Sequence, residues 1–311
     1  MILSILLAGY WSGVHPGSAR IRERNLATRA VRPNPMPGIL IVEPSLSWDP
    51  ITLREIAVPE VDRAGDLYSN LHSYLRSCNV DGVKVDAQAA VTMLGSSTGG
   101  SAHTTKKFVQ AMERSVTEHF GPDNNCINCM CHPTECLYSY HDTSVARASD
   151  DFYPRDKASH STHLANVAYN SIFIGEVVQP DWDMFQSRHP AAMLHAVARA
   201  VGGCALYVSD KPGVHDFSVL RRLVLPDGSV LRALLPGRPT RDSLFVDITS
   251  DGRSALKIWN RNPCAGVVAA FNIQGSAWDK VSRQNRMSGV EPNVTARLKP
   301  RDVEGFVRFP D

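Results

Sequence analysis

The sequence has 311 residues, of which 43% are hydrophobic and 21% charged, so it is long and apolar enough to form a large folded domain. This composition excludes a disordered or low-complexity chain. The formal net charge is only +2 and the basic residues are interspersed with acidic ones, so we expect neither a nucleic acid nor an anionic membrane as partner. A neutral small molecule fits this charge better.

The seven cysteines are an odd number in a chain that is too large to need disulfide bonds for its stability. We therefore expect free thiols and a reducing compartment, the cytoplasm. Residues 1–8 are apolar, but they lack a basic start and a cleavage site and are too short to span a bilayer. They predict a buried strand.

In chain order, residues 12–65 are rich in Pro, Ser and Gly and show little periodicity, which predicts a long irregular insertion after the first strand. Short apolar runs bounded by polar residues or Gly then predict strands at residues 80–85, 126–131, 144–148, 171–178 and 204–208. Longer stretches between or after them predict helices at residues 106–118, 159–169, 190–201 and 217–224.

This alternation of strands and helices predicts an α/β fold with a parallel sheet, either closed as a (β/α)₈ TIM-type barrel or open. Carboxylates follow several different strands, and this favours a barrel over residues 1–225 with a site at its C-terminal face. From residue 226 onward the runs 243–248, 256–259 and 266–272 alternate with Gly and Asp turns, so residues 226–311 predict a small C-terminal β domain.

The first candidate site residues are Lys84 and Asp86, which lie two positions apart at the end of a predicted strand and so share one face. A lysine beside an aspartate keeps the carboxylate ionised, as a nucleophile requires, and can also bind a substrate hydroxyl. An ion pair at a strand end on the protein surface is an equally good interpretation.

A second acidic pair, Asp150 and Asp151, follows Arg147 at another predicted strand end. Adjacent side chains on an extended chain point to opposite sides, so at most one of the two carboxylates can face a pocket shared with Asp86. Two carboxyl groups roughly 5–5.5 Å apart are the machinery of a retaining glycosidase. The alternative is a helix N-cap, a common role for aspartate.

Asp181, Trp182 and Asp183 follow a further apolar run. Carboxylates bind sugar hydroxyls and an indole stacks on the C–H face of a sugar, so this combination suits a carbohydrate pocket. A polar turn with a buried tryptophan anchor explains the same residues.

A cysteine-rich segment offers a different class of function, because Cys126, Cys129, Cys131 and Cys136 surround His132 in a way that suggests a zinc-binding module. However, these cysteines lie along a predicted strand, where Cys129 and Cys131 share one face and Cys126 faces the other. Structural zinc sites usually draw their ligands from turns, so we expect no metal.

Together these segments resemble the raffinose synthase and seed imbibition protein family, which includes alkaline α-galactosidases and galactosyltransferases. The resemblance covers most of residues 66–280. It is carried by residues 8–11 (AGYW), 72–75 (HSYL), the Asp86 strand, 147–154 (RASDDFYP), 179–185 (QPDWDMF), 198–204 (ARAVGGC), 207–213 (YVSDKPG), 236–242 (PGRPTRD) and 271–275 (FNIQG).

The resemblance implies a retaining barrel enzyme of α-galactosides in which Asp86 forms a galactosyl-enzyme and Lys84 binds the sugar. The acid/base would be Asp151 by its spacing from Arg147, or Asp150 by alignment of the Ser-Asp-Asp triplet. The same resemblance places Trp11, Cys129, Arg147, Asp181, Trp182 and Asp183 around the galactose. A two-carboxylate mechanism needs no cofactor.

Family members begin with a large β domain and two more barrel strands before the segment that corresponds to Tyr10 and Trp11, so the barrel of this chain is expected to lack its first strands. An incomplete or degenerate homologue without activity is therefore the alternative function. The local form of residues 148–156 resembles the α-galactosidase branch, which favours hydrolysis over galactosyl transfer.

Overall fold

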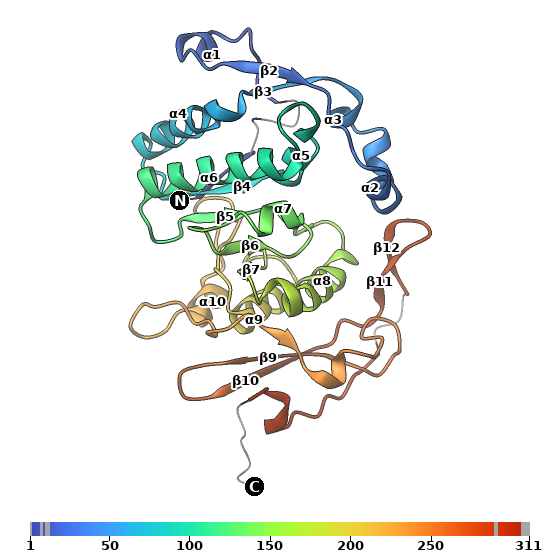
Figure 1. Cartoon of the computed structure of the whole chain (residues 1–311). Helices are drawn as coiled ribbons and strands as arrows, with labels where there is room; N and C mark the ends of the chain where they lie inside the picture. Colours follow the sequence, from blue (N-terminus) through green and yellow to red (C-terminus); the bar gives the residue numbers. More distant parts are fainter. Residues whose placement is uncertain (1, 7–8, 10–12, 289–291, 306–311) are drawn as a thin grey trace. The chain divides into compact units, whose positions relative to one another are not determined.

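The computed structural model describes residues 2–6, 9, 13–288 and 292–305. The chain divides into two compact units, unit 1 (Met1–Arg147) and unit 2 (Ala148–Asp311). Both combine helices with strands (Figure 1). The predicted boundaries at residues 225 and 226 stay a prediction.

Unit 1 is built on a parallel sheet in the order β1 (Ile2–Leu6), β4 (Gly82–Asp86), β5 (Cys126–Asn128) and β6 (Val145–Arg147). Neighbouring strands are parallel throughout. The predicted α/β fold with a parallel sheet is thereby confirmed. No closed barrel is present among the described residues.

Two long helices pack on this sheet, α4 (Ala64–Ser77) and α6 (Ser101–Phe120), and they lie side by side in Figure 1. Their apolar faces bury Tyr68 and Phe108 in the same core as Val83 and Val85 of β4. Because Val83 and Val85 point into this core, the alternating residues of β4 face the other side of the sheet. Burial of the valines therefore fixes the face that carries Lys84 and Asp86.

The region predicted as an irregular insertion contains short regular elements. They are α1 (Ala19–Glu23), β2 (Thr28–Val31), α2 (Pro37–Val42), α3 (Pro50–Leu53) and β3 (Ile56–Pro59). β2 and β3 form an antiparallel pair. Two further short helices follow the strands that carry candidate site residues, namely α5 (Ala89–Thr92) after β4 and α7 (Thr134–Leu137) after β5.

Unit 2 contains α8 (Ser159–Ile174), β7 (Gln179–Asp181), α9 (Ala192–Gly202) and α10 (Phe217–Leu220). An antiparallel sheet in the order β10 (Gly266–Phe271), β9 (Leu256–Arg261) and β8 (Arg238–Pro239) follows, with the hairpin of β11 (Ser276–Asp279) and β12 (Gln284–Met287). The sheet packs against α8 and α9.

The strand predicted at residues 171–178 is wrong, because α8 continues to Ile174 and the strand β7 begins only at Gln179. Leu164, Val167, Ala168, Ser171 and Ile174 are buried at helical spacing, whereas Ile172 and Phe173 are exposed. The apolar run thus extends the buried face of a helix.

Two other predicted strands are also wrong. Residues 204–208 form only an isolated bridge between Phe185 and Val208. Residues 243–248 form the end of a 3₁₀ turn and a loop in which Asp247 accepts hydrogen bonds from the backbone N–H groups of Thr249 and Ser250. Such local side-chain bonds compete with strand pairing. The strands predicted at residues 256–259 and 266–272 are confirmed as β9 and β10.

No helix in the described part of the chain is long and apolar enough to cross a membrane.

Because His72 is buried, we expect the free energy of unfolding to depend on pH. Its Nδ1 lies 2.9 Å from the Ser115 hydroxyl, and burial, followed by the nearby His119, lowers the pKa of His72 to about 4. Between pH 7 and pH 5 the unfolded chain takes up a proton on His72 that the folded protein does not, so we expect the free energy of unfolding to fall by about 2 kcal/mol from this residue.

Urea unfolding at both pH values measures this loss. His72→Gln is expected to reduce the pH dependence, whereas His103→Gln, at an exposed position on α6, is expected to leave it unchanged. An equal pH dependence in all three proteins would contradict the assignment to His72.

Candidate active site

In unit 1 the carboxylate of Asp86 ends β4 and meets a sharp turn of the chain. Its Oδ1 accepts a hydrogen bond of 2.7 Å from the backbone N–H of Ala87, whose φ is +55°. A positive φ at a residue other than glycine is uncommon and marks a position where the fold demands a particular geometry. The turn holds the carboxylate at the carboxyl end of the strand.

Cys129 lies directly after β5 and reaches the same place. Its backbone N–H donates to the carbonyl of Val85 at 2.9 Å, and the carboxylate of Asp86 acts electrostatically on its thiol. Burial raises the pKa of Cys129 to about 12, although the cations Arg147 and Lys84 lower it. The thiol is therefore protonated at neutral pH.

Arg147 ends β6 and is buried. Lys84, Asp86 and Arg147 all act electrostatically on Cys129, so these four predicted residues gather at the carboxyl ends of neighbouring parallel strands. Parallel sheets bind their ligands at this edge. A group that combines a carboxylate, two cations and a neutral thiol can supply a nucleophile there and bind hydroxyl groups.

Gln88 and Asn128 support this group, and the motifs of the sequence did not reveal them. The Gln88 amide donates to the Val85 carbonyl at 3.0 Å and to Asn128 Oδ1 at 2.8 Å, and its own oxygen accepts from the Tyr140 hydroxyl at 2.6 Å. Asn128 in turn donates to the hydroxyl of Thr143. Two fully buried amides thus tie the ends of β4 and β5 together.

The cysteines beside this site are free, buried thiols. Burial raises the pKa of Cys131 and of Cys136 to about 12. In the part of the chain that the structure describes, no group of three or more His, Cys, Asp or Glu side chains is arranged to hold a metal ion.

Unit 2 carries the remaining predicted acids. Asp181 ends β7 and is fully buried, and its Oδ2 accepts from the Tyr207 hydroxyl at 2.8 Å and from the Asp183 N–H at 3.1 Å. Asp183 has a φ of +62°, and its Oδ2 accepts from the N–H of Phe152 at 2.9 Å. Asp183 therefore joins the end of β7 to the segment that bears Asp150 and Asp151.

Asp150 and Asp151 lie in different environments. The Asp150 carboxylate lies 3.5 Å from Nδ1 of the buried His163 and is about one third exposed, with a side-chain exposure of 36%. Asp151 is exposed. The two adjacent acids therefore differ in solvation, which is the condition for giving two carboxyl groups different roles.

Trp182 is fully buried. A Cβ atom at Gly202 would lie 2.6 Å from its indole ring, so the ring packs closely on the backbone of α9. Trp182 therefore packs between α9 and the segment that carries Asp181 and Asp183. Trp11, the remaining predicted pocket residue, lies outside the described residues.

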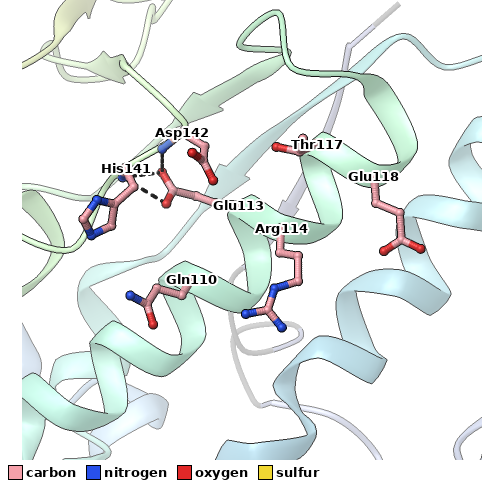
Figure 2. Close-up of a pocket in the computed structure, with 7 residues that line it drawn as sticks. All are labelled: Gln110, Glu113, Arg114, Thr117, Glu118, His141 and Asp142. Carbon is pink, nitrogen blue, oxygen red and sulfur yellow. Dashed lines mark hydrogen bonds between the residues drawn. The ribbon is translucent and has the colours of Figure 1, made fainter.

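A separate cavity of about 690 Å³ lies beside α6 (Figure 2) and is lined by Gln110, Glu113, Arg114, Thr117, Glu118, His141 and Asp142. The Glu113 carboxylate accepts hydrogen bonds from the backbone N–H groups of His141, Asp142 and Thr143 and from the Thr143 hydroxyl. This loop leads into the amino end of β6, whereas Arg147 lies at the carboxyl end. Glu113 therefore fixes the loop, and we assign it no role in chemistry.

Glu113→Gln is expected to lower the free energy of unfolding by about 3 kcal/mol, because the amide supplies donors where the backbone also supplies donors. The matched control is Glu118→Gln, at an exposed position of the same helix, which is expected to change stability by less than about 0.5 kcal/mol. Urea unfolding of both variants makes the comparison, and equal effects would contradict the structural role of Glu113.

The parallel α/β sheet, with acids, cations and a thiol at the ends of its strands, has the features of an α/β protein that binds a small polar molecule at the strand ends. The chain belongs to the raffinose synthase or seed imbibition protein Sip1 family, whose sequence pattern matches residues 4–307.

Among its relatives are two Arabidopsis thaliana proteins named probable galactinol–sucrose galactosyltransferase 6 and 1, which are 49% identical over 301 residues and 48% identical over 298 residues. In both cases the match covers 96% of this chain and 39% of the relative, so the chain spans about two fifths of their length. Stachyose synthase of Pisum sativum is 34% identical, over 90% of this chain and 33% of that protein.

Among solved structures, an α-galactosidase from Thermus thermophilus in complex with stachyose matches with a TM-score of 0.41 and 17% identity. The match covers 68% of this chain and 46% of that structure.

Proposed function

We propose that this protein acts on α-galactosides with retention of the anomeric configuration, as a glycosidase or transglycosidase. Asp86 attacks the anomeric carbon to form a galactosyl-enzyme. The main support for this proposal is the group of Asp86, Lys84 and Cys129 at the strand ends of a chain that belongs to the raffinose synthase family. In this proposal Lys84 binds a sugar hydroxyl, and Cys129 remains a neutral thiol in the same group.

Asp151 is proposed as the acid/base, with Asp150 as the alternative. An exposed carboxyl group is accessible to an incoming acceptor, from which the second half of the reaction must remove a proton. Asp150 is instead held beside His163, a contact that suits an anchoring role. A retaining mechanism requires the nucleophile and the acid/base to come within roughly 5–5.5 Å of each other.

The sugar would be bound by Asp181 and Asp183 through its hydroxyls, with Trp182 beneath them and with Arg147 and Trp11 also at the galactose. We further propose that the whole protein completes a (β/α)₈ barrel followed by a C-terminal β domain. The parallel sheet of unit 1 and the antiparallel sheet of β8, β9 and β10 support this proposal. The two-carboxylate chemistry uses no metal or organic cofactor.

Galactosyl transfer and hydrolysis share the same intermediate and differ only in whether a sugar hydroxyl or water resolves it. The names of the relatives support transfer from galactinol to sucrose. The local sequence of residues 148–156 favours water as the acceptor. We also propose a cytoplasmic location, since all seven cysteines are free thiols.

The test is time-resolved product analysis of the full-length protein that contains this sequence, incubated with raffinose alone, with galactinol alone and with galactinol plus sucrose. Raffinose formed from galactinol and sucrose would show transfer, and free galactose would show hydrolysis. A folded protein that forms neither product would contradict the proposed function and favour a homologue without activity.

A further inference from the structure

The guanidinium of Arg199 on α9 is fully buried and holds three consecutive carbonyl groups. Nε donates to the Asp183 carbonyl at 2.7 Å, and Nη2 donates to the carbonyls of Trp182 and Met184 at 2.6 and 2.8 Å. Nη1 faces His195, 3.1 Å from its carbonyl and 3.0 Å from its Nδ1. Each of the five N–H groups of the guanidinium therefore has an acceptor.

These contacts determine the protonation of a buried pair of histidines. A guanidinium only donates, so the Nδ1 of His195 carries a lone pair and its proton is on Nε2. That Nε2 lies 2.8 Å from Nδ1 of His160, to which it donates, so His160 is also protonated on Nε2. Burial lowers the pKa of His195 far below its ordinary value and lowers that of His160 to about 4, so both rings are neutral at pH 7.

The carbonyls that Arg199 holds belong to the segment that leaves the end of β7. Asp183, at the centre of this segment, has a left-handed backbone and accepts the N–H of Phe152, the residue after Asp151. A continuous path of hydrogen bonds thus runs from His195 through Arg199 and Asp183 to the segment of the acids. None of these residues has a role in the mechanism proposed above except Asp183 and Asp151.

We propose that Arg199, oriented by His195, is a positioning residue that holds the backbone of residues 182–184 and through Asp183 places Asp151 for proton transfer. This inference rests on the proposed function. An ammonium has three N–H groups for the five acceptors that a guanidinium satisfies here, so Arg199→Lys loosens the segment. A displacement of about 1 Å at an acid/base lowers the rate by about 100-fold.

The decisive measurement compares leaving groups in the full-length protein. The leaving group of raffinose is sucrose, a poor alkoxide that needs a proton from the acid. The leaving group of 2,4-dinitrophenyl α-galactoside is dinitrophenolate, a stable anion that departs without a proton. Arg199→Lys is expected to lower the rate of galactosylation about 100-fold with raffinose and far less with the dinitrophenyl substrate. A merely structural loss would lower both rates equally, and that result would overturn the proposal.

Two replacements of His195 test the roles of its two ring nitrogen atoms separately. The amide of Asn reaches the position of Nδ1 and can still accept from Arg199, whereas the amide of Gln reaches the position of Nε2. We expect His195→Asn to keep most of the raffinose activity and His195→Gln to behave like Arg199→Lys. Arg241→Lys, whose side chain is 81% exposed, is the matched control and is expected to act like the parent protein.

The NMR spectrum of the ¹⁵N-labelled histidines tests the role of His195 and Arg199 independently of the proposed function. At pH 7 His195 is expected to show an unprotonated Nδ1 and a protonated Nε2 in the parent protein and to lose this pattern in Arg199→Lys. A protonated Nδ1 in an active parent would overturn the inference alone. A parent with the expected spectrum but without activity on any α-galactoside would overturn the proposed function.

Discussion

Replacement of Asp86 by alanine is expected to lower kcat on α-galactosides by about 10⁴-fold in the full-length protein, because the enzyme loses the carboxylate that attacks the anomeric carbon and the covalent intermediate cannot form. The fold should persist, since Asp86 lies at the end of β4 and the core is formed by Val83 and Val85 on the opposite face. Circular dichroism and urea unfolding check that the variant is folded.

Rescue by azide distinguishes the loss of the nucleophile from general damage to the active site in Asp86→Ala. Azide can occupy the space left by the carboxylate and attack the sugar from the same side in a single displacement, which gives β-galactosyl azide from an α-galactoside. We expect Asp86→Ala to recover part of its rate on an activated aryl substrate with azide. Asp81→Asn, at an exposed position just before β4, is the control and should keep the parent activity. A loss below tenfold in Asp86→Ala would contradict its role.

Replacement of Asp151 by asparagine is expected to lower activity on raffinose by about 10³-fold, because the leaving sugar then departs without a proton. With a dinitrophenyl leaving group, formation of the galactosyl-enzyme stays fast, but its breakdown by water slows because the base is missing. The intermediate therefore accumulates, and a burst of dinitrophenol measures it.

Asp150→Asn is the matched comparison, since it removes the neighbouring charge beside His163. We expect it to affect the raffinose and dinitrophenyl substrates to a similar degree. If Asp150→Asn instead shows the burst, Asp150 is the acid/base and the spacing from Arg147 is the wrong guide.

The sequence allowed the strand ends to be located because short apolar runs and period-2 alternation report burial directly. Lys84 and Asp86 share a face because Val83 and Val85 occupy the other one. The same method failed at residues 171–178, where a helix and a strand can show equal apolarity over a short span. There the register of Leu164, Val167, Ala168 and Ser171 was the better signal.

The residues that support the site could not be predicted from the sequence motifs. His195 and Arg199 lie at i, i+4 on one helix, a pattern visible in the sequence, but their partners are carbonyl groups of residues 182–184 and carry no side-chain signal. Gln88 binds Asn128 across 40 positions, and only the pairing of β4 with β5 brings them together. The chemistry of the strand ends can be predicted from residue types, whereas the hydrogen bonds that orient it depend on tertiary contacts.

Trapping of the intermediate with a 2-deoxy-2-fluoro α-galactosyl donor that carries a good leaving group tests the galactosyl-enzyme most directly. The fluorine slows both the formation and the breakdown of the intermediate, whereas the good leaving group accelerates only its formation, so the intermediate accumulates. The labelled protein can then be digested and read by mass spectrometry. One fluorogalactosyl group on the peptide that contains Asp86, with its ester on that carboxylate, is the expected result. A stoichiometric label on any other residue of an active protein would contradict the assignment.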